Sequence, residues 1–319
     1  MKLGIIGTSW ISHEFARGAA LAGFTIGGVM SRDKARGEAF LAEYGGGTVC
    51  ATIEEMAADH SIDVVYIASP NVLHYTQSIA LIRAGKHVLV EKPCYMSLSQ
   101  LDEVLSLAKE KSVYVLETMR SLYSPVTEKV REALPLIGPL RHVYFNWMVR
   151  STRYDAFQAG ELPSVFDKKM GGGALNDLGV YLIYACLDLF GSPSGIDWRS
   201  IPLDSGVDGV FDLMLGYEGF HAILSASKIS TSQIDSEIQG EDGSILIKPL
   251  FLRGEVVWKD NAGNTTVIID GNAVDDMYMQ QKALLDILKG EDEAGLARAH
   301  QFMRESTMIL ERCRAELGG

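Results

Sequence analysis

Short apolar segments alternate with amphipathic segments along the first third of the chain. Near-continuous apolar runs typical of buried strands occupy residues 3–6, 26–30, 64–68, 87–90 and 113–116. The segments between them carry apolar residues at helical spacing, and Gly23 is placed to end the first predicted helix. This alternation predicts a parallel sheet with helices on both faces, a doubly wound α/β domain covering residues 1–118.

The remaining two thirds of the chain follow a different pattern. Residues 143–149 predict a strand, and residues 171–190 predict a glycine loop leading into a helix. From 210 to 269, short apolar runs are separated by turn-like breaks, which is typical of antiparallel strands. Residues 277–288 and 297–317 return to helical periodicity. We therefore expect residues 119–319 to form an α+β domain with a large, mostly antiparallel, open-faced sheet.

Composition narrows the classes of partner. The 319 residues include 29 Lys and Arg against 41 Asp and Glu, a formal charge of −12. Such a balance without a basic stripe argues against nucleic acid or an anionic membrane as a partner. The longest apolar run, residues 180–187, is far shorter than a membrane span needs, and residues 1–7 do not form a signal peptide. We expect a cytoplasmic protein that holds any anionic ligand by local donors.

Cysteine and histidine positions indicate no metal centre. Four cysteines are widely scattered, none belongs to a CxxC pair, and none shares metal-ligand spacing with the seven histidines. Reduced thiols in a cytosolic protein are the expectation.

A candidate phosphate loop follows the first predicted strand. Its sequence is GxSxxS where a dinucleotide loop usually has GxGxxG, and its candidate cofactor-binding residues are Gly7, Thr8, Ser9, Trp10 and Ile11. Amide groups and the dipole at the start of the following helix favour a pyrophosphate there. A plain strand–turn–helix without ligand remains the alternative.

The end of the second strand bears on the choice of coenzyme. Sites for NAD usually carry Asp or Glu there to hold the ribose 2′-hydroxyl, whereas this chain has Ser31 and Arg32. A hydroxyl and a guanidinium suit a 2′-phosphate, so NADP(H) is the preferred cofactor and NAD(H) the alternative. We interpret Asp33 as a helix N-cap. The alternatives are that Arg32 is an ordinary surface residue and that Asp33 binds the ribose.

Three motifs carry a family resemblance. They are SPNxxH at residues 69–74, AGKHV…EKP at 84–93, and GGGALNDLGVY at 171–181. Together they resemble the Gfo/Idh/MocA oxidoreductase family over about the whole chain. The resemblance implies a Rossmann cofactor domain, an α+β substrate domain and nicotinamide-dependent chemistry. Tyrosine at 181, where inositol-dehydrogenase-like members have histidine, is similar to glucose–fructose oxidoreductase, D-xylose dehydrogenase and dimeric dihydrodiol dehydrogenase.

The chemistry of these motifs can also be argued from the residues. Lys92 ends a buried strand at the sheet edge where ligands of such folds bind, and Glu91 is suited to orient it. A lysine there donates to a substrate oxygen and stabilises developing negative charge. Asp177 and Tyr181, spaced i and i+4, project from one helix face. A tyrosine phenol near a cation serves as general acid or base.

The resemblance assigns further roles. Lys92 matches the family's catalytic lysine and Asp177 its substrate-contacting aspartate. The first two motifs supply the candidate cofactor contacts Ser69, Asn71, His74, Glu91 and Lys92. For His74, tying down the turn is an equal alternative to ligand contact. Glu117 matches the start of the interdomain segment, and the family's following arginine is Leu122 here, with Arg120 or Arg150 as substitutes.

These observations lead to one main hypothesis and two alternatives. The hypothesis is an NADP(H)-preferring oxidoreductase acting on the secondary alcohol or carbonyl of a sugar, polyol or dihydrodiol. The first alternative is a non-catalytic sensor on the same scaffold; the second, an amino- or hydroxy-acid dehydrogenase, would need an arginine fork that the motifs lack. Apolar residues on the strands of residues 210–269 predict a homodimer through the open sheet face, unless residues 152–169 cover it.

Overall fold

The computed structural model describes residues 1–248, 254–270 and 275–317, and the chain divides into two compact units. Unit 1 comprises residues 1–119 and 277–307, and unit 2 comprises residues 120–276 and 308 onward. The predicted boundary at 118/119 lies one residue before this division. The later helical segment 277–307, predicted as part of the second domain, instead packs with unit 1.

Unit 1 contains a six-stranded parallel sheet in the order β3-β2-β1-β4-β5-β6, which confirms the doubly wound prediction. Its strands are β1 (Lys2–Ile6), β2 (Thr25–Met30), β3 (Thr48–Cys50), β4 (Val64–Ile67), β5 (His87–Glu91) and β6 (Val115–Thr118). The edge strand β3 was not predicted, because it has three residues and no apolar run.

The helices of unit 1 occupy the segments between its strands, as predicted, and the segment after residue 275. They are α1 (Trp10–Ala22), α2 (Lys34–Ala42), α3 (Ile53–Ala58), the short η1 (Asn71–Leu73), α4 (His74–Arg83), α5 (Leu98–Lys111), α9 (Asp276–Leu288) and most of α10 (Glu293–Glu316). Gly23 ends α1 in the left-handed region, with φ of 104°. Asp33 accepts a hydrogen bond from the backbone N–H of Arg36, so its predicted N-cap role is confirmed.

Unit 2 is built on an eight-stranded sheet in the order β14-β13-β12-β11-β7-β10-β9-β8. Its strands are β7 (Leu140–Met148), β8 (Gly195–Pro202), β9 (Asp208–Tyr217), β10 (Phe220–Ser227), β11 (Ser236–Gly240), β12 (Gly243–Lys248), β13 (Glu255–Asp260) and β14 (Thr265–Ile269). Only β7 and β10 pair in parallel among these strands, which confirms a mostly antiparallel sheet. Residues 249–253 of the predicted strand region lie outside the described residues.

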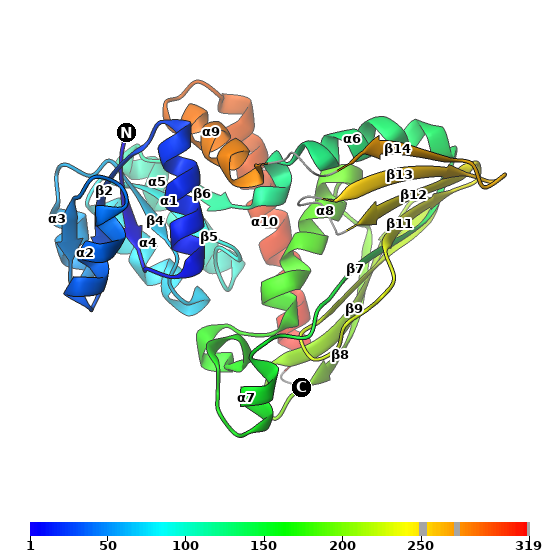
Figure 1. Ribbon diagram of the computed structural model, residues 1–319, viewed down its shortest axis with the longest axis horizontal. Helices are drawn as coiled ribbons and strands as arrows, with labels where there is room; N and C mark the ends of the chain where they lie inside the picture. The colour runs from blue at the N-terminus through cyan, green and yellow to red at the C-terminus, as the bar shows by residue number, and fades with distance from the viewer. Residues whose placement is uncertain (249–253, 271–274, 318–319) are drawn as a thin grey trace. The chain divides into compact units, whose positions relative to one another are not determined.

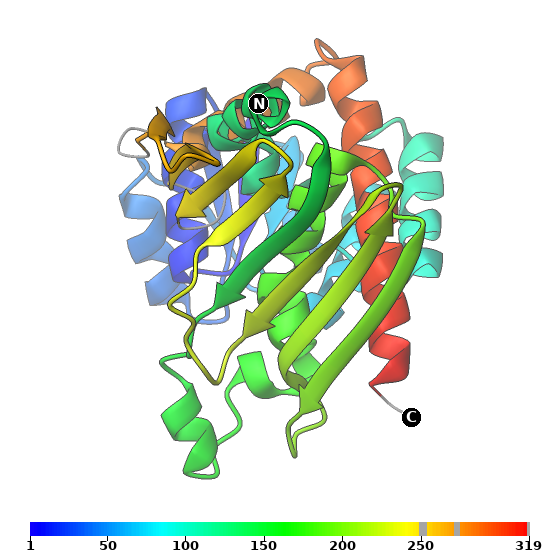
Figure 2. The ribbon, with the colours of Figure 1, turned by 90° about the vertical axis from the view of Figure 1, so that its right-hand side faces the viewer.

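Helices α6 (Pro125–Ala133) and α8 (Val180–Phe190) lie on one face of this sheet (Figure 1). The shorter elements of unit 2 are α7 (Tyr154–Gln158), the π-helical turn η6 (Leu175–Gly179) before α8, and the 3₁₀ turns η2 (Arg120–Tyr123), η3 (Leu134–Ile137), η4 (Ser164–Phe166) and η5 (Lys168–Met170). Figure 2 looks onto the other face, on which no described helix of unit 2 lies.

The two faces of this sheet differ in character. On β9, Phe211, Leu213 and Leu215 are buried, whereas Asp212 and Met214 between them are exposed. Apolar residues on the strands of residues 210–269 were predicted to form a homodimer interface at the open face, but these three, by their alternation, lie on the face that the helices cover. They therefore do not contribute to that predicted interface.

One helical stretch, Lys168–Phe190, is long and apolar enough by length and composition to cross a membrane. However, 67% of its apolar window is buried within the protein. An all-round apolar helix is also what the core of a folded domain requires. We therefore describe this stretch as a core helix.

Candidate functional site

The loops after β1 and β4 meet where the strand order of the unit 1 sheet reverses, the place where doubly wound folds bind ligands. Gly7 has a φ of +100°, and a Cβ there would lie 3.3 Å from the carbonyl oxygen of Ala68. Glycine is therefore required at position 7 both by backbone conformation and by the close approach of the two loops.

The start of α1 suits an anionic group. Its N-cap, Ser9, makes no side-chain cap bond, and the first turn contains no acidic residue. The loop before it is held by Arg36, whose guanidinium donates to the carbonyl oxygen of Thr8 at 3.0 Å. The structure thus brings the predicted residues 7–11 together in a turn that opens onto helix amide groups, and these residues fit the pyrophosphate of a dinucleotide.

Ser31, Arg32 and Asp33 follow β2 at the same edge of the sheet. The Ser31 hydroxyl donates to the carbonyl oxygen of Asp33 at 2.7 Å, and the Asp33 carboxylate is occupied in capping α2. Arg32 is exposed. This arrangement leaves a guanidinium, not a capping carboxylate, as the charged group best suited to the ribose end of a coenzyme.

His74 is fully buried and joins two segments of the sheet edge. Its Nε2 lies 2.9 Å from the carbonyl oxygen of Ser69, and its Nδ1 lies 3.1 Å from that of Cys94. Burial lowers the pKa of His74. Both ring nitrogens face the backbone, which favours the turn-tying role over direct contact with a cofactor. His74 thereby fixes the SPN turn, including Asn71, against the segment after Lys92.

Glu91 is built into the end of β5. Its Oε1 accepts from the Tyr66 hydroxyl at 2.5 Å and from the Thr118 hydroxyl at 2.9 Å, and its Oε2 accepts from the backbone N–H of Lys92 at 3.2 Å. These contacts orient the backbone at Lys92 instead of leaving the carboxylate for a ligand. Glu117 acts similarly, since it accepts from the backbone N–H of Cys94 at 2.8 Å.

Asp177 and Tyr181 belong to unit 2, whereas Lys92 belongs to unit 1. The i, i+4 argument assumed an α-helix, but Asp177 lies in the π-helical turn η6 and Tyr181 in the first turn of α8. Insertions of this kind occur often at functional sites. The side chain of Asp177 is 38% exposed, while Tyr181 is 8% exposed. Tyr184, one turn further along α8, is 1% exposed and packs in the core.

The ring of Tyr181 packs on an indole from the sheet. The centroids of Tyr181 and Trp147 on β7 are 4.9 Å apart, with the planes tilted by 40°. Trp147 also lines a cavity of about 300 Å³, bounded further by residues 232–236. Trp147 therefore both packs on the candidate acid/base and borders this cavity of unit 2.

A lysine that the sequence interpretation did not single out pairs with Asp177. Lys228 directly follows β10, and its ammonium group forms an ion pair and hydrogen bond with Oδ2 of Asp177. Its side chain is only 10% exposed. The sequence feature that could have identified Lys228 is its position directly after an apolar strand, because a charge that is buried there needs a partner of opposite charge.

The start of the helical segment carrying Asp177 is held by a buried carboxylate. Oδ2 of Asp208 accepts from the backbone N–H of Leu175 at 2.6 Å, and Asp208 is 2% exposed. Burial raises the pKa of Asp208 to about 7. A Cβ at Gly173 would overlap this carboxylate, and Gly173 has a φ of +112°. The glycine loop therefore allows Asp208 to reach the helix start.

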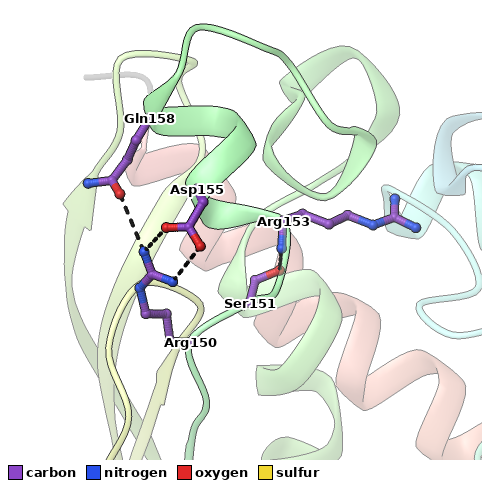
Figure 3. Close-up of polar contacts among 5 residues, drawn as sticks. All are labelled: Arg150, Ser151, Arg153, Asp155 and Gln158. Atoms are coloured by element: carbon purple, nitrogen blue, oxygen red, sulfur yellow. Dashed lines mark hydrogen bonds and ion pairs between the residues drawn. The ribbon is translucent and has the colours of Figure 1, made fainter.

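Arg150, one of the two cations considered as a replacement at the substrate site, is already engaged. Its guanidinium donates to Asp155 at 2.6 Å and to Gln158 at 3.3 Å (Figure 3). The hydrogen bond with Asp155 raises the pKa of Arg150. In the same view Arg153 extends away from this cluster. Arg150 thus stabilises the start of α7.

Comparison with family models identifies both parts of the chain. Residues 1–118 match the model described as oxidoreductase family, NAD-binding Rossmann fold, and residues 135–246 match the GFO/IDH/MocA C-terminal domain.

Individual relatives match most or all of the chain. The scyllo-inositol 2-dehydrogenase (NADP(+)) of Bacillus subtilis is 34% identical, covering 100% of this chain and 97% of that protein. The trans-1,2-dihydrobenzene-1,2-diol dehydrogenase of Mus musculus is 27% identical, covering 81% of this chain and 77% of the relative. A 3-ketoreductase from Actinomadura kijaniata, solved with NADP and TDP-benzene, shares the fold with a TM-score of 0.82 and 21% identity over 97% and 95% of the chains.

Proposed function

Because this chain belongs to the Gfo/Idh/MocA oxidoreductase family, we propose that it is an NADP(H)-preferring dehydrogenase or reductase. Its substrate class is a secondary alcohol, or the corresponding carbonyl, of a sugar, polyol or dihydrodiol. The observation that best supports the proposal is that the chain has a lysine, an aspartate and a tyrosine at the motif positions expected of an acid/base site. Lys92 follows a strand end fixed by Glu91, and Asp177 and Tyr181 begin a core helix.

Tyr181, Lys92 and Asp177 each have a distinct chemical role in this proposal. The nicotinamide supplies the hydride chemistry when bound. Tyr181 gives or takes the proton of the substrate oxygen, and the ammonium of Lys92 stabilises the negative charge that develops on that oxygen. Asp177, with an accessible carboxylate, accepts a hydrogen bond from a neighbouring substrate hydroxyl. Packing against Trp147 restricts the ring of Tyr181.

NADP(H) is proposed as the preferred coenzyme, with NAD(H) as the alternative. The exposed Arg32 supports this preference, because Asp33 is engaged as the N-cap of α2. Two relatives are named as NADP(+) enzymes: the Bacillus subtilis scyllo-inositol 2-dehydrogenase and a D-xylose 1-dehydrogenase of Haloferax volcanii.

The relatives' names also support the substrate class, since they cover an inositol, a dihydrodiol and a pentose. The amino- or hydroxy-acid alternative needs a free arginine fork for a carboxylate. Arg150 does not supply one, because Asp155 and Gln158 engage it. A sugar or polyol hydroxyl needs only single donors and acceptors of the kind that Lys92 and Asp177 provide.

A substrate screen tests the proposal directly. Purified protein is incubated with NADPH or NADH and a panel of ketoses, inosones and aldoses, and with NADP⁺ and a panel of inositols and dihydrodiols, while absorbance at the reduced-nicotinamide band is followed. Turnover with at least one member that is lost in Tyr181→Phe supports the enzyme. Tight NADPH binding without turnover on any member would instead favour the sensor alternative.

We also propose a homodimer formed through the uncovered sheet face. A row of directly paired residues crosses that face: Met214, Ile223, Tyr144, Glu237, Leu246, Val257 and Val267. All except Glu237 are apolar or aromatic; Met214 and Val267 are 43% and 55% exposed, whereas Val257 is only 5% exposed. A mostly apolar row on a sheet face, here interrupted at Glu237, is typical of a surface that pairs with another. Cytoplasmic localisation, without nucleic-acid or membrane partners, remains part of the proposal.

A further inference from the structure

The ion pair between Lys228 and Asp177 joins segments that lie 51 residues apart in the sequence. One partner is a buried cation on the sheet, and the other is a partly exposed carboxylate at the start of the core helix. A buried ammonium costs several kcal/mol of desolvation, so its position is retained only where a partner compensates for it. Because the side chain of Lys228 is less exposed than that of Asp177, the lysine contacts the carboxylate on its side away from solvent.

The backbone of Lys228 is fixed on both sides. Its N–H donates to the carbonyl oxygen of Gly209 at 2.9 Å, and its own carbonyl oxygen accepts from the N–H of Ser151 at 2.8 Å. Lys228 therefore extends the hydrogen-bonded pairing of β10 by one residue, with β9 on one side and the segment after β7 on the other. The side chain thus starts from a rigid base, which a positioning residue needs.

The main chain of Asp177 is held by its N–H, which donates to the carbonyl oxygen of Gly173 at 3.2 Å. It lies in the π-helical turn, where the regular α-helical hydrogen-bond pattern is interrupted. The main chain alone does not fix the carboxylate at its end, so contacts of the carboxylate itself, Lys228 among them, orient it. The ammonium of Lys228 contacts Oδ2 of Asp177 and so orients the plane of this carboxyl group. Tyr181 lies one helical turn further along the chain.

We propose that Lys228 is a positioning residue, which holds the Asp177 carboxylate in the orientation that engages the substrate. Lys228 itself stays beneath the carboxylate, out of contact with the reacting atoms. This inference rests on the proposed function, since it assigns Asp177 to the substrate. It adds a residue that no motif of the sequence contains.

The test compares Lys228→Met, which keeps the length of the side chain, with Lys228→Arg, which keeps the charge. Lys228→Met is expected to lower kcat by about 10- to 100-fold, the range typical when the partner that orients a metal ligand is removed. The dissociation constant of NADPH should stay unchanged, and Lys228→Arg should recover most of the activity. Lys129→Met is the matched control, because Lys129 also pairs with an acid, Glu132, but is 45% exposed on α6.

A double-mutant cycle separates positioning from a general structural effect. In an Asp177→Asn background, Lys228→Met should cost less than twofold, because the carboxylate that it orients is already gone. The same 10- to 100-fold loss in both backgrounds, or near-normal kcat in Lys228→Met, would overturn the inference. Wild-type protein without any turnover would count against the proposed function instead.

A crystal structure of Lys228→Met gives a readout that does not depend on activity. The expected result is an Asp177 side chain that rotates or becomes disordered while Tyr181 and Trp147 keep their contact. An Asp177 carboxylate that is unmoved in this variant would refute the positioning role even if no substrate were found.

Discussion

Asp208 makes the stability of unit 2 depend on pH in a way that a single substitution can isolate. Burial raises the pKa of Asp208 from its ordinary value of 3.8 to about 7. The folded protein then binds this proton more tightly than the unfolded chain does. The associated stability is fully present below about pH 4 and is lost as the pH rises through about 7.

The size of the effect follows from these two values. At about 1.4 kcal/mol per pKa unit, the contribution of the Asp208 proton to the free energy of unfolding falls by about 2–3 kcal/mol between pH 5 and pH 8. Asp208→Asn removes the ionisation and keeps an amide oxygen able to accept from the N–H of Leu175. The amide NH₂ group that Asp208→Asn introduces can change the free energy of unfolding by a constant amount. This does not affect the comparison, because only the change in that free energy with pH is compared.

The measurement is urea unfolding followed by circular dichroism at pH 5 and pH 8. Between these two pH values the free energy of unfolding of the wild type should fall by about 2–3 kcal/mol more than that of Asp208→Asn. Asp197→Asn on β8 is the control, since its carboxylate is 58% exposed, and it should follow the wild type. Equal pH dependence in the wild type and Asp208→Asn would refute the assignment of a proton to buried Asp208 at neutral pH.

Three further predictions address the proposed function and assembly. Tyr181→Phe and Lys92→Ala should each lower kcat by about 10²–10⁴-fold with NADPH affinity nearly unchanged in titration, and a near-normal kcat in Tyr181→Phe would exclude it as the acid. Arg32→Ala should weaken NADPH binding by about tenfold or more and NADH binding hardly at all, so equal losses would remove its 2′-phosphate role. Ile223→Glu should lower the light-scattering mass from that of a dimer to the chain's own 34.9 kDa, unlike Leu21→Glu on α1; a wild type already at 34.9 kDa would end the dimer proposal.

The sequence by itself predicts most of unit 1, because its elements are specified by neighbouring residues. The apolar run before Gly7, the cap at Asp33 and the stop at Gly23 each depend on contacts within a few positions. Strand β3 escaped prediction for the same reason, since three residues at a sheet edge carry too little local pattern. The motifs around Lys92, Asp177 and Tyr181 likewise identify the family without coordinates.

Tertiary structure alone decided which distant residues share a site and which unit each helix joins. Residues 277–307 have the same helical periodicity as any core helix, and only packing assigns them to unit 1. The pairing of Lys228 with Asp177 and the capping of Leu175 by Asp208 join positions 51 and 33 residues apart. Such contacts form because a buried charge or amide group must find a partner wherever the fold brings one near. Local pattern specifies that such a partner is needed, and only the folded chain selects it.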